Sequence, residues 1–218
     1  MLSRSTQTNE PARCATLLPA LCRLPQPLAL LELGASAGLC LLPDRYAYSY
    51  NGRRLRPSGE SFSDTVLFPC RANAVAPIPT RLPTIVWRAG LDLNPVDLRD
   101  DGEISWLENL VWPGQEDRAQ RLRLAIRLAR RDPPTVVQGN LLTDVPSLDG
   151  KAPSGITLVV YHSATLAYVG SKRAREQFAK SMAESDFVIE LFAWRRRPRS
   201  GLCLNPSGTR AGSSLSPE

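Results

Sequence analysis

Residues 28–38 read LALLELGASAG, and their pattern is the clearest indication of the fold class. Residues 28–33 form an apolar run interrupted only by Glu32, which predicts a short buried strand. A run without regular alternation of polar and apolar residues is typical of a parallel strand covered on both faces. The small residues from Gly34 to Gly38 then predict a tight turn into a helix over residues 39–42. The stretch therefore indicates the start of an α/β unit.

Apolar runs and helical spacing recur along the rest of the chain. Short apolar runs predict further strands over residues 84–87, 135–137, 156–161 and 187–191. Helical spacing predicts helices over residues 10–24, within 100–131 and over 172–184. Asn9 is expected to cap the first of these helices. Strands alternating with helices predict an α/β fold with a Rossmann-like parallel sheet and helices on both faces.

The chain is expected to divide into three parts around this sheet. Residues 1–27 should hold an N-terminal helix, and residues 28–194 the Rossmann-like domain. Residues 44–82 look irregular and predict an insertion after the first strand and helix, with a hairpin turn at Asn51-Gly52. From Arg195 the sequence is rich in Arg, Pro, Ser and Gly, so we expect residues 195–218 to be a disordered tail.

The distribution of charge argues against a nucleic-acid partner. The 218 residues carry a formal net charge of +6, of which residues 195–218 contribute five arginines and one glutamate, or +4. The remaining +2 gives the body of the chain little field to attract a polyanion. No run approaches the ~20 apolar residues of a membrane helix, and the first ten residues lack the apolar core of a signal peptide. A cytoplasmic protein is expected.

The cysteines and histidines indicate neither a metal site nor a disulfide scaffold. The five cysteines show no Cys-x-x-Cys spacing, and His162 is the single histidine. Zinc sites normally draw on several such residues, so we expect reduced thiols and no metal.

Two motifs at predicted strand ends suggest a nucleotide-bearing cofactor. In the first, with Glu32, Gly34 and Gly38, small residues let the backbone approach a ligand, and the predicted helix offers free N–H groups. In the second, Asp92 is the acid that typically accepts hydrogen bonds from ribose hydroxyls. Two structural alternatives remain open: a tight turn without a ligand, and an Asp92 that caps the turn at Asn94-Pro95.

Two further motifs follow later strands. Asn140 can accept a hydrogen bond from an adenine amino group, and Leu141 can pack on the ring. His162 leaves the clearest strand at the carboxyl edge, where ligands of open sheets bind, and is the candidate catalytic residue. The alternative is a structural histidine.

The first motif resembles that of S-adenosylmethionine-dependent methyltransferases, and several blocks resemble a bacterial family called domain of unknown function 2332. The blocks are residues 7–10 through 17–19, 31–39, 44–46, 92–97, 111–113 and 162–164. The resemblance implies a methyltransferase-type Rossmann fold that binds S-adenosylmethionine and acts on an unknown acceptor. The implied cofactor-binding residues are Glu32, Gly34, Ala35, Ser36, Gly38, Asp92, Leu93, Asn140 and Leu141.

The chain also departs from the pattern of that family. Members usually carry a helical region before the equivalent of Thr6 and further sheet after the last strand, so the sheet is expected to be incomplete and the chain truncated at both ends. Cys40 stands where Asn is expected, and Asn140 where Asp is expected.

Two other functions remain open. The first is a degenerate, non-catalytic Rossmann-like protein. The second is a serine hydrolase, because residues 34–38 fit Gly-x-Ser-x-Gly with Ser36 as nucleophile and His162 downstream. Against the hydrolase, one predicted helix precedes this strand, whereas several strands normally precede such a nucleophile.

Overall fold

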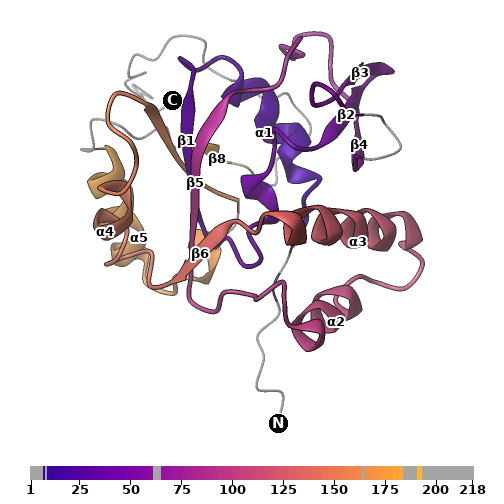
Figure 1. Ribbon diagram of the computed structural model, residues 1–218. Coiled ribbons are helices and arrows are strands. Elements are labelled where there is room, and N and C mark those ends of the chain that lie inside the picture. The colour runs from indigo at the N-terminus through magenta and orange to yellow at the C-terminus, as the bar shows by residue number, and fades with distance from the viewer. Residues whose placement is uncertain (1–6, 8, 61–64, 164, 184–190, 193–218) are drawn as a thin grey trace, which may run out of the picture.

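A five-stranded parallel sheet runs through the centre of the computed structural model, which describes residues 7, 9–60, 65–163, 165–183 and 191–192 (Figure 1). Its strands lie in the order β6-β5-β1-β7-β8. They are β1 (Leu28–Leu33), β5 (Ile85–Asp92), β6 (Thr135–Gln138), β7 (Thr157–His162) and β8 (Leu191–Phe192). The predicted tail and residues 187–190 of the predicted last strand lie outside the described residues.

The strand order gives the sheet a point at which the direction of winding reverses. The chain runs outward from β1 to β5 and β6, and then returns to β7 on the other side of β1. All four pairings between neighbouring strands are parallel. The prediction of an α/β fold with a Rossmann-like parallel sheet is therefore confirmed. Strand β5 continues to Asp92, beyond its predicted end at residue 87.

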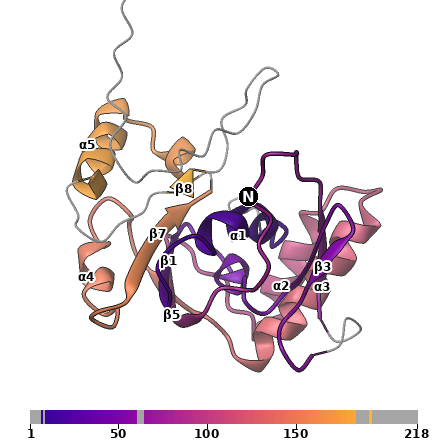
Figure 2. The ribbon, with the colours of Figure 1, turned by 90° about the horizontal axis from the view of Figure 1, so that it is seen from above.

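All six residues of β1 are buried, because helices cover both faces of the sheet. Leu28 and Leu30 pack toward α1 (Arg13–Leu21) and the short 3₁₀ helix η1 (Leu39–Leu41). The residues that alternate with them pack toward α4 (Pro146–Asp149) and α5 (Lys172–Ala183). Figure 2 shows α4 and α5 on one side of the sheet and α1, α2 and α3 on the other.

The prediction of a helix over residues 39–42 is wrong. Leu39–Leu41 form a single 3₁₀ turn, in which the Leu41 N–H donates to the Gly38 carbonyl at 3.0 Å. Pro43 has no N–H and disfavours helical backbone in the residue before it, so four residues are too few to close a helical ladder. The loop after β1 therefore lacks the helix N-terminus that the sequence suggested.

The other helices follow the apolar pattern, with different caps. Helix α1 begins after Ala12, and Asn9 does not cap it, because its side chain bonds the loop after β1. Helices α2 (Asp101–Asn109) and α3 (Glu116–Arg131) are separated by a turn in which Gly114 has φ +84°. Asp100 caps α2, because its carboxylate accepts the N–H groups of residues 102 and 103.

Three short strands between residues 47 and 70 form a second sheet, which shares its core with α1 and α3. Strands β2 (Ala47–Tyr50), β3 (Arg53–Leu55) and β4 (Leu67–Cys70) lie in the order β3-β2-β4. Asn51 and Gly52 have φ of 50° and 88°, as a type I′ turn requires, so the predicted hairpin is confirmed.

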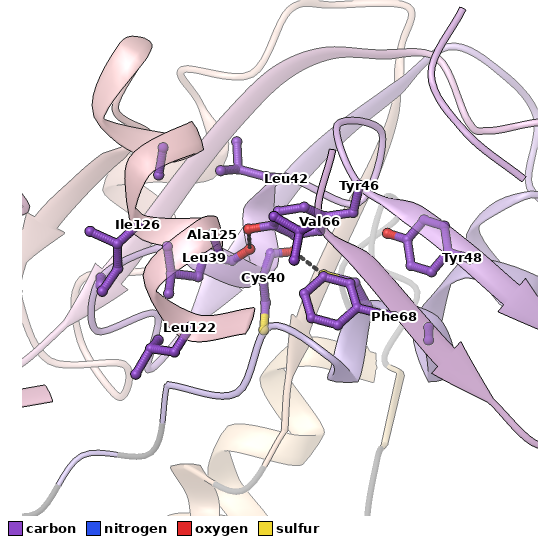
Figure 3. Packing of buried hydrophobic residues seen from close by; sticks show 14 of the residues in the cluster. Leu39, Cys40, Leu42, Tyr46, Tyr48, Val66, Phe68, Leu122, Ala125 and Ile126 are labelled. Atoms are coloured by element: carbon purple, nitrogen blue, oxygen red, sulfur yellow. Dashed lines mark hydrogen bonds between the residues drawn. The ribbon is translucent and has the colours of Figure 1, made fainter. Parts of the chain in front are cut away.

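Aromatic side chains fill the core of this second sheet, which continues under α3 (Figure 3). The Tyr46 ring meets that of Phe68 edge-on, with 5.0 Å between centroids. The Tyr46 hydroxyl donates to the Leu39 carbonyl at 2.8 Å, and that of Tyr48 to the Pro43 carbonyl at 2.6 Å. These bonds tie the second sheet to the chain that leaves β1.

Candidate functional site

A cavity of about 390 Å³ opens at the carboxyl edge of the main sheet. It spans the ends of β1, β5, β6 and β7, and so includes the point at which the winding reverses. Open α/β sheets bind their ligands at this position, because the loops there separate to opposite sides of the sheet. The cavity is therefore the candidate functional site.

The structure brings six of the ten predicted site residues to this cavity. The lining residues among them are Gly34, Ser36, Asp92, Leu93, Asn140 and Leu141. The other four, Glu32, Ala35, Gly38 and His162, are not among the described residues that line it. The predicted residues that line the cavity therefore lie at or just after the ends of β1, β5 and β6, and four residues from the segment after β7 also line it.

The glycine loop, residues 34–38, needs its glycines for its own packing. Gly34 has φ +75°, and a Cβ there would lie 2.0 Å from Thr165 Oγ1. Gly38 has φ +69°, and its Cβ would lie 2.7 Å from Pro134 Cγ. Gly34 is thus held close to the segment after β7, while Gly38 packs against the segment that leads into β6.

Asp92 holds the glycine loop against the end of β5. One carboxylate oxygen accepts the Ser36 N–H and the other accepts the Asn94 N–H, each at 2.8 Å. The bond to Asn94 is the turn cap that the sequence left open as an alternative. Each oxygen keeps a second lone pair, and Asp92 lines the cavity, so its acceptor capacity is not exhausted.

The loop after β6 is also held by its own side chains. The side-chain oxygen Oδ1 of Asn140 accepts the Leu142 N–H at 2.9 Å, and the Asn140 backbone N–H donates to the Asp144 carboxylate at 2.8 Å. This N–H lowers the pKa of Asp144, and Thr143 adds to the effect. Asn140 therefore lines the cavity from a fixed turn.

Gln7 and Asn9 are site residues to which the sequence assigned no binding role, although both lie in a block that carries the family resemblance. The Asn9 amide accepts the Ala37 N–H at 3.0 Å and donates to Ser36 Oγ at 2.7 Å. Gln7 donates to the Asn94 carbonyl at 2.7 Å and accepts the Ser36 hydroxyl hydrogen. Gln7 therefore joins the glycine loop to the turn after β5, and Asn9 holds the loop to the segment before α1.

These contacts bear on Ser36 as a possible nucleophile. Its φ of 51° is the left-handed conformation that a nucleophile elbow adopts. Its hydroxyl, however, bonds the amides of Gln7 and Asn9, whereas a nucleophilic serine bonds a base. The hydrogen bonds therefore favour a structural role for the hydroxyl.

Glu32 and His162 lie on opposite faces of the sheet. Glu32 follows Leu28 and Leu30 on the α1 face, and His162 follows Leu158 and Val160 on the α5 face. They are 4% and 6% exposed. Burial raises the pKa of Glu32 well above its usual range, Cys40 and Asp92 add to the rise, and Arg13 opposes it. The two residues therefore do not form an acid–base pair in the cavity.

Arg13, from the first turn of α1, supplies positive charge to the cavity. Its guanidinium Nη1 donates to Ser163 Oγ, just after β7, at 2.5 Å.

No group of His, Cys, Asp and Glu side chains in the described part of the chain could hold a metal ion. Within the same residues, no helix is long and apolar enough to cross a membrane.

Comparison with known proteins identifies a family but no activity for it. No curated protein and no solved structure matches the chain. The family described as an uncharacterized protein conserved in bacteria, domain of unknown function 2332, matches residues 1–194. Because the match covers most of the 218 residues, the chain belongs to the domain of unknown function 2332 family.

Proposed function

We propose that the cavity binds S-adenosylmethionine and that the protein is methyltransferase-like, with a methyl acceptor still to be identified. The observation that carries the proposal is one cavity joining the glycine loop after β1, the acid after β5 and the amide after β6. Nucleotide-binding sheets present their loop, ribose acceptor and base site in this spatial order. The proposed cofactor would supply a methyl group bound to a positively charged sulfur.

The residues that line the cavity fit the parts of such a ligand. A volume of about 390 Å³ lies within the usual range for small-molecule sites. Asp92 has free lone pairs for ribose hydroxyls, and Asn140 has an amide for the adenine edge. Leu93 is 60% exposed and offers an apolar surface for the base.

Calorimetric titration of the full chain with S-adenosylmethionine tests the proposal. We expect saturable binding, and we expect Leu93→Ser to weaken it at least about tenfold, because a leucine buried against a ligand contributes about 1.5–3 kcal/mol. Val75→Ser is the matched control, because Val75 is 80% exposed and does not line the cavity. No heat and no thermal shift with a demonstrably folded chain would reject the proposal.

The same preparation separates the two remaining functions. A serine hydrolase would cleave an activated ester, and Ser36→Ala would abolish that cleavage. We expect no such cleavage by the wild type, because the Ser36 hydroxyl hydrogen is donated to an amide oxygen. A folded chain that neither binds the cofactor nor cleaves an ester would match the degenerate, non-catalytic alternative.

A further inference from the structure

The two charged residues in the candidate site lie near the ends of different strands. Of the described residues that line the cavity, Arg13 and Asp92 alone carry a charge. Asp92 ends β5, whereas Arg13 reaches Ser163 after β7, on the other side of β1. A bound molecule therefore meets an acceptor group toward β5 and a cation toward β7.

The charge on Arg13 has no ionic partner among the described residues. Its recorded side-chain bond is to the neutral Ser163 hydroxyl, and none of the described ion pairs includes it. Glu32 is close enough to feel its charge, but burial raises the pKa of that carboxyl and favours its neutral form. The Arg13 charge is therefore not balanced by an ion pair within the described residues.

The geometry of the guanidinium group selects the kind of anion. It has five N–H donors in a planar fork, and one bond to Ser163 leaves donors for both oxygens of a carboxylate. One arginine without a second cation balances a single negative charge. Asp92 in the same cavity disfavours a doubly charged phosphate by repulsion.

We propose that Arg13 forms a carboxylate subsite that receives the amino-acid end of the cofactor, beside the glycine loop and away from the adenine site. This inference rests on the proposed function. Its spatial basis is that Arg13, Gly34 and Ser163 line the cavity near β1 and β7, whereas Asn140 lines it beyond β5. A ligand whose nucleoside lies over β5 and β6 extends its other end toward Arg13.

The test compares two ligands that share the nucleoside. S-adenosylhomocysteine carries the amino-acid carboxylate, and 5′-methylthioadenosine lacks it. We expect Arg13→Gln to weaken the binding of S-adenosylhomocysteine about tenfold or more. The affinity for 5′-methylthioadenosine should change by less than about twofold. Arg23→Gln is the matched control for lost charge, because Arg23 is exposed shortly after α1 and does not line the cavity, and neither affinity should change.

Binding of 5′-methylthioadenosine also shows whether the Arg13→Gln variant is folded. If Arg13→Gln binds neither ligand, Arg13→Lys replaces it, since lysine keeps the charge and loses the planar fork. That variant should bind S-adenosylhomocysteine more weakly than the wild type and 5′-methylthioadenosine equally well. An equal loss for both ligands, or none for either, overturns the subsite and leaves the proposed function standing. A wild type that binds neither ligand rejects both proposals.

Discussion

At Asp92, one side chain both holds the glycine loop and faces the cavity. Its two oxygens accept the N–H groups of Ser36 and Asn94, so replacing it would release the loop and the turn together. The loss of two such bonds costs about 1–3 kcal/mol each, even before any ligand is considered. Variants at exposed lining positions such as Leu93 therefore test binding more cleanly than variants of Asp92.

Glu32 gives a pH-dependent prediction. Burial holds its pKa in the folded chain well above the ordinary value of 4.5, and its Oε2 atom has no hydrogen-bond partner among the described residues. As the pH rises above about 4.5, the unfolded chain releases this proton and the folded chain keeps it. The free energy of unfolding then falls, by at most about 1.4 kcal/mol per pH unit, until the raised pKa is reached.

Glu32→Gln removes this titration while keeping the shape of the side chain. We therefore expect the variant to gain stability relative to the wild type as the pH rises above 4.5, with no such trend at lower pH. Urea unfolding of both proteins at several pH values measures the difference. A difference that stays constant from pH 4 to pH 8 would show that Glu32 is not buried as described.

At the scale of the elements, the sequence predicted β1 well and the segment after it badly. Residues 28–33 contain five apolar residues and Glu32 and are followed by Gly34, a pattern that few structures other than a buried parallel strand can accommodate. All six residues are buried in the structure. The helix expected after Gly38 failed because four apolar residues before Pro43 fit a helical turn and a 3₁₀ turn equally. Asn9 looked like a cap because local sequence does not reveal a competing partner 28 residues away at Ala37.

The contact between Asn9 and the glycine loop gives a second prediction. Asn9→Ala removes the acceptor of the Ala37 N–H and the donor to Ser36 Oγ, which should destabilise the folded chain by about 1–3 kcal/mol. Asn73 is exposed and its side chain forms no hydrogen bond with the described residues, so Asn73→Ala should stay within about 0.5 kcal/mol of the wild type. Urea unfolding measures both, and equal effects would contradict the role of Asn9.

At the scale of the whole molecule, the sequence could predict residues that directly follow strands. The carboxyl ends of parallel strands meet at one edge, so Gly34, Asp92 and Asn140 could be expected together. Gln7 and Arg13 could not, because they reach the cavity from a segment before the sheet, which only tertiary packing positions.

The placement of Glu32 and His162 shows a second limit of the sequence. Both belong to strands, where alternate side chains point to opposite faces, and helices cover both faces of this sheet. Knowing that a residue stands near the end of a strand therefore did not show that its side chain reaches the cavity.

We propose above that a nucleoside-bearing cofactor binds at the carboxyl edge of the main sheet. Nuclear magnetic resonance of the ¹⁵N-labelled full chain, titrated with S-adenosylhomocysteine, tests it by location. Binding in the cavity should give saturable shifts of the backbone N–H signals at Gly34, Ser36, Leu93 and Leu141 and leave the β2–β3 hairpin unchanged. No shifts at saturating ligand, or shifts confined to elements away from the carboxyl edge, would contradict it.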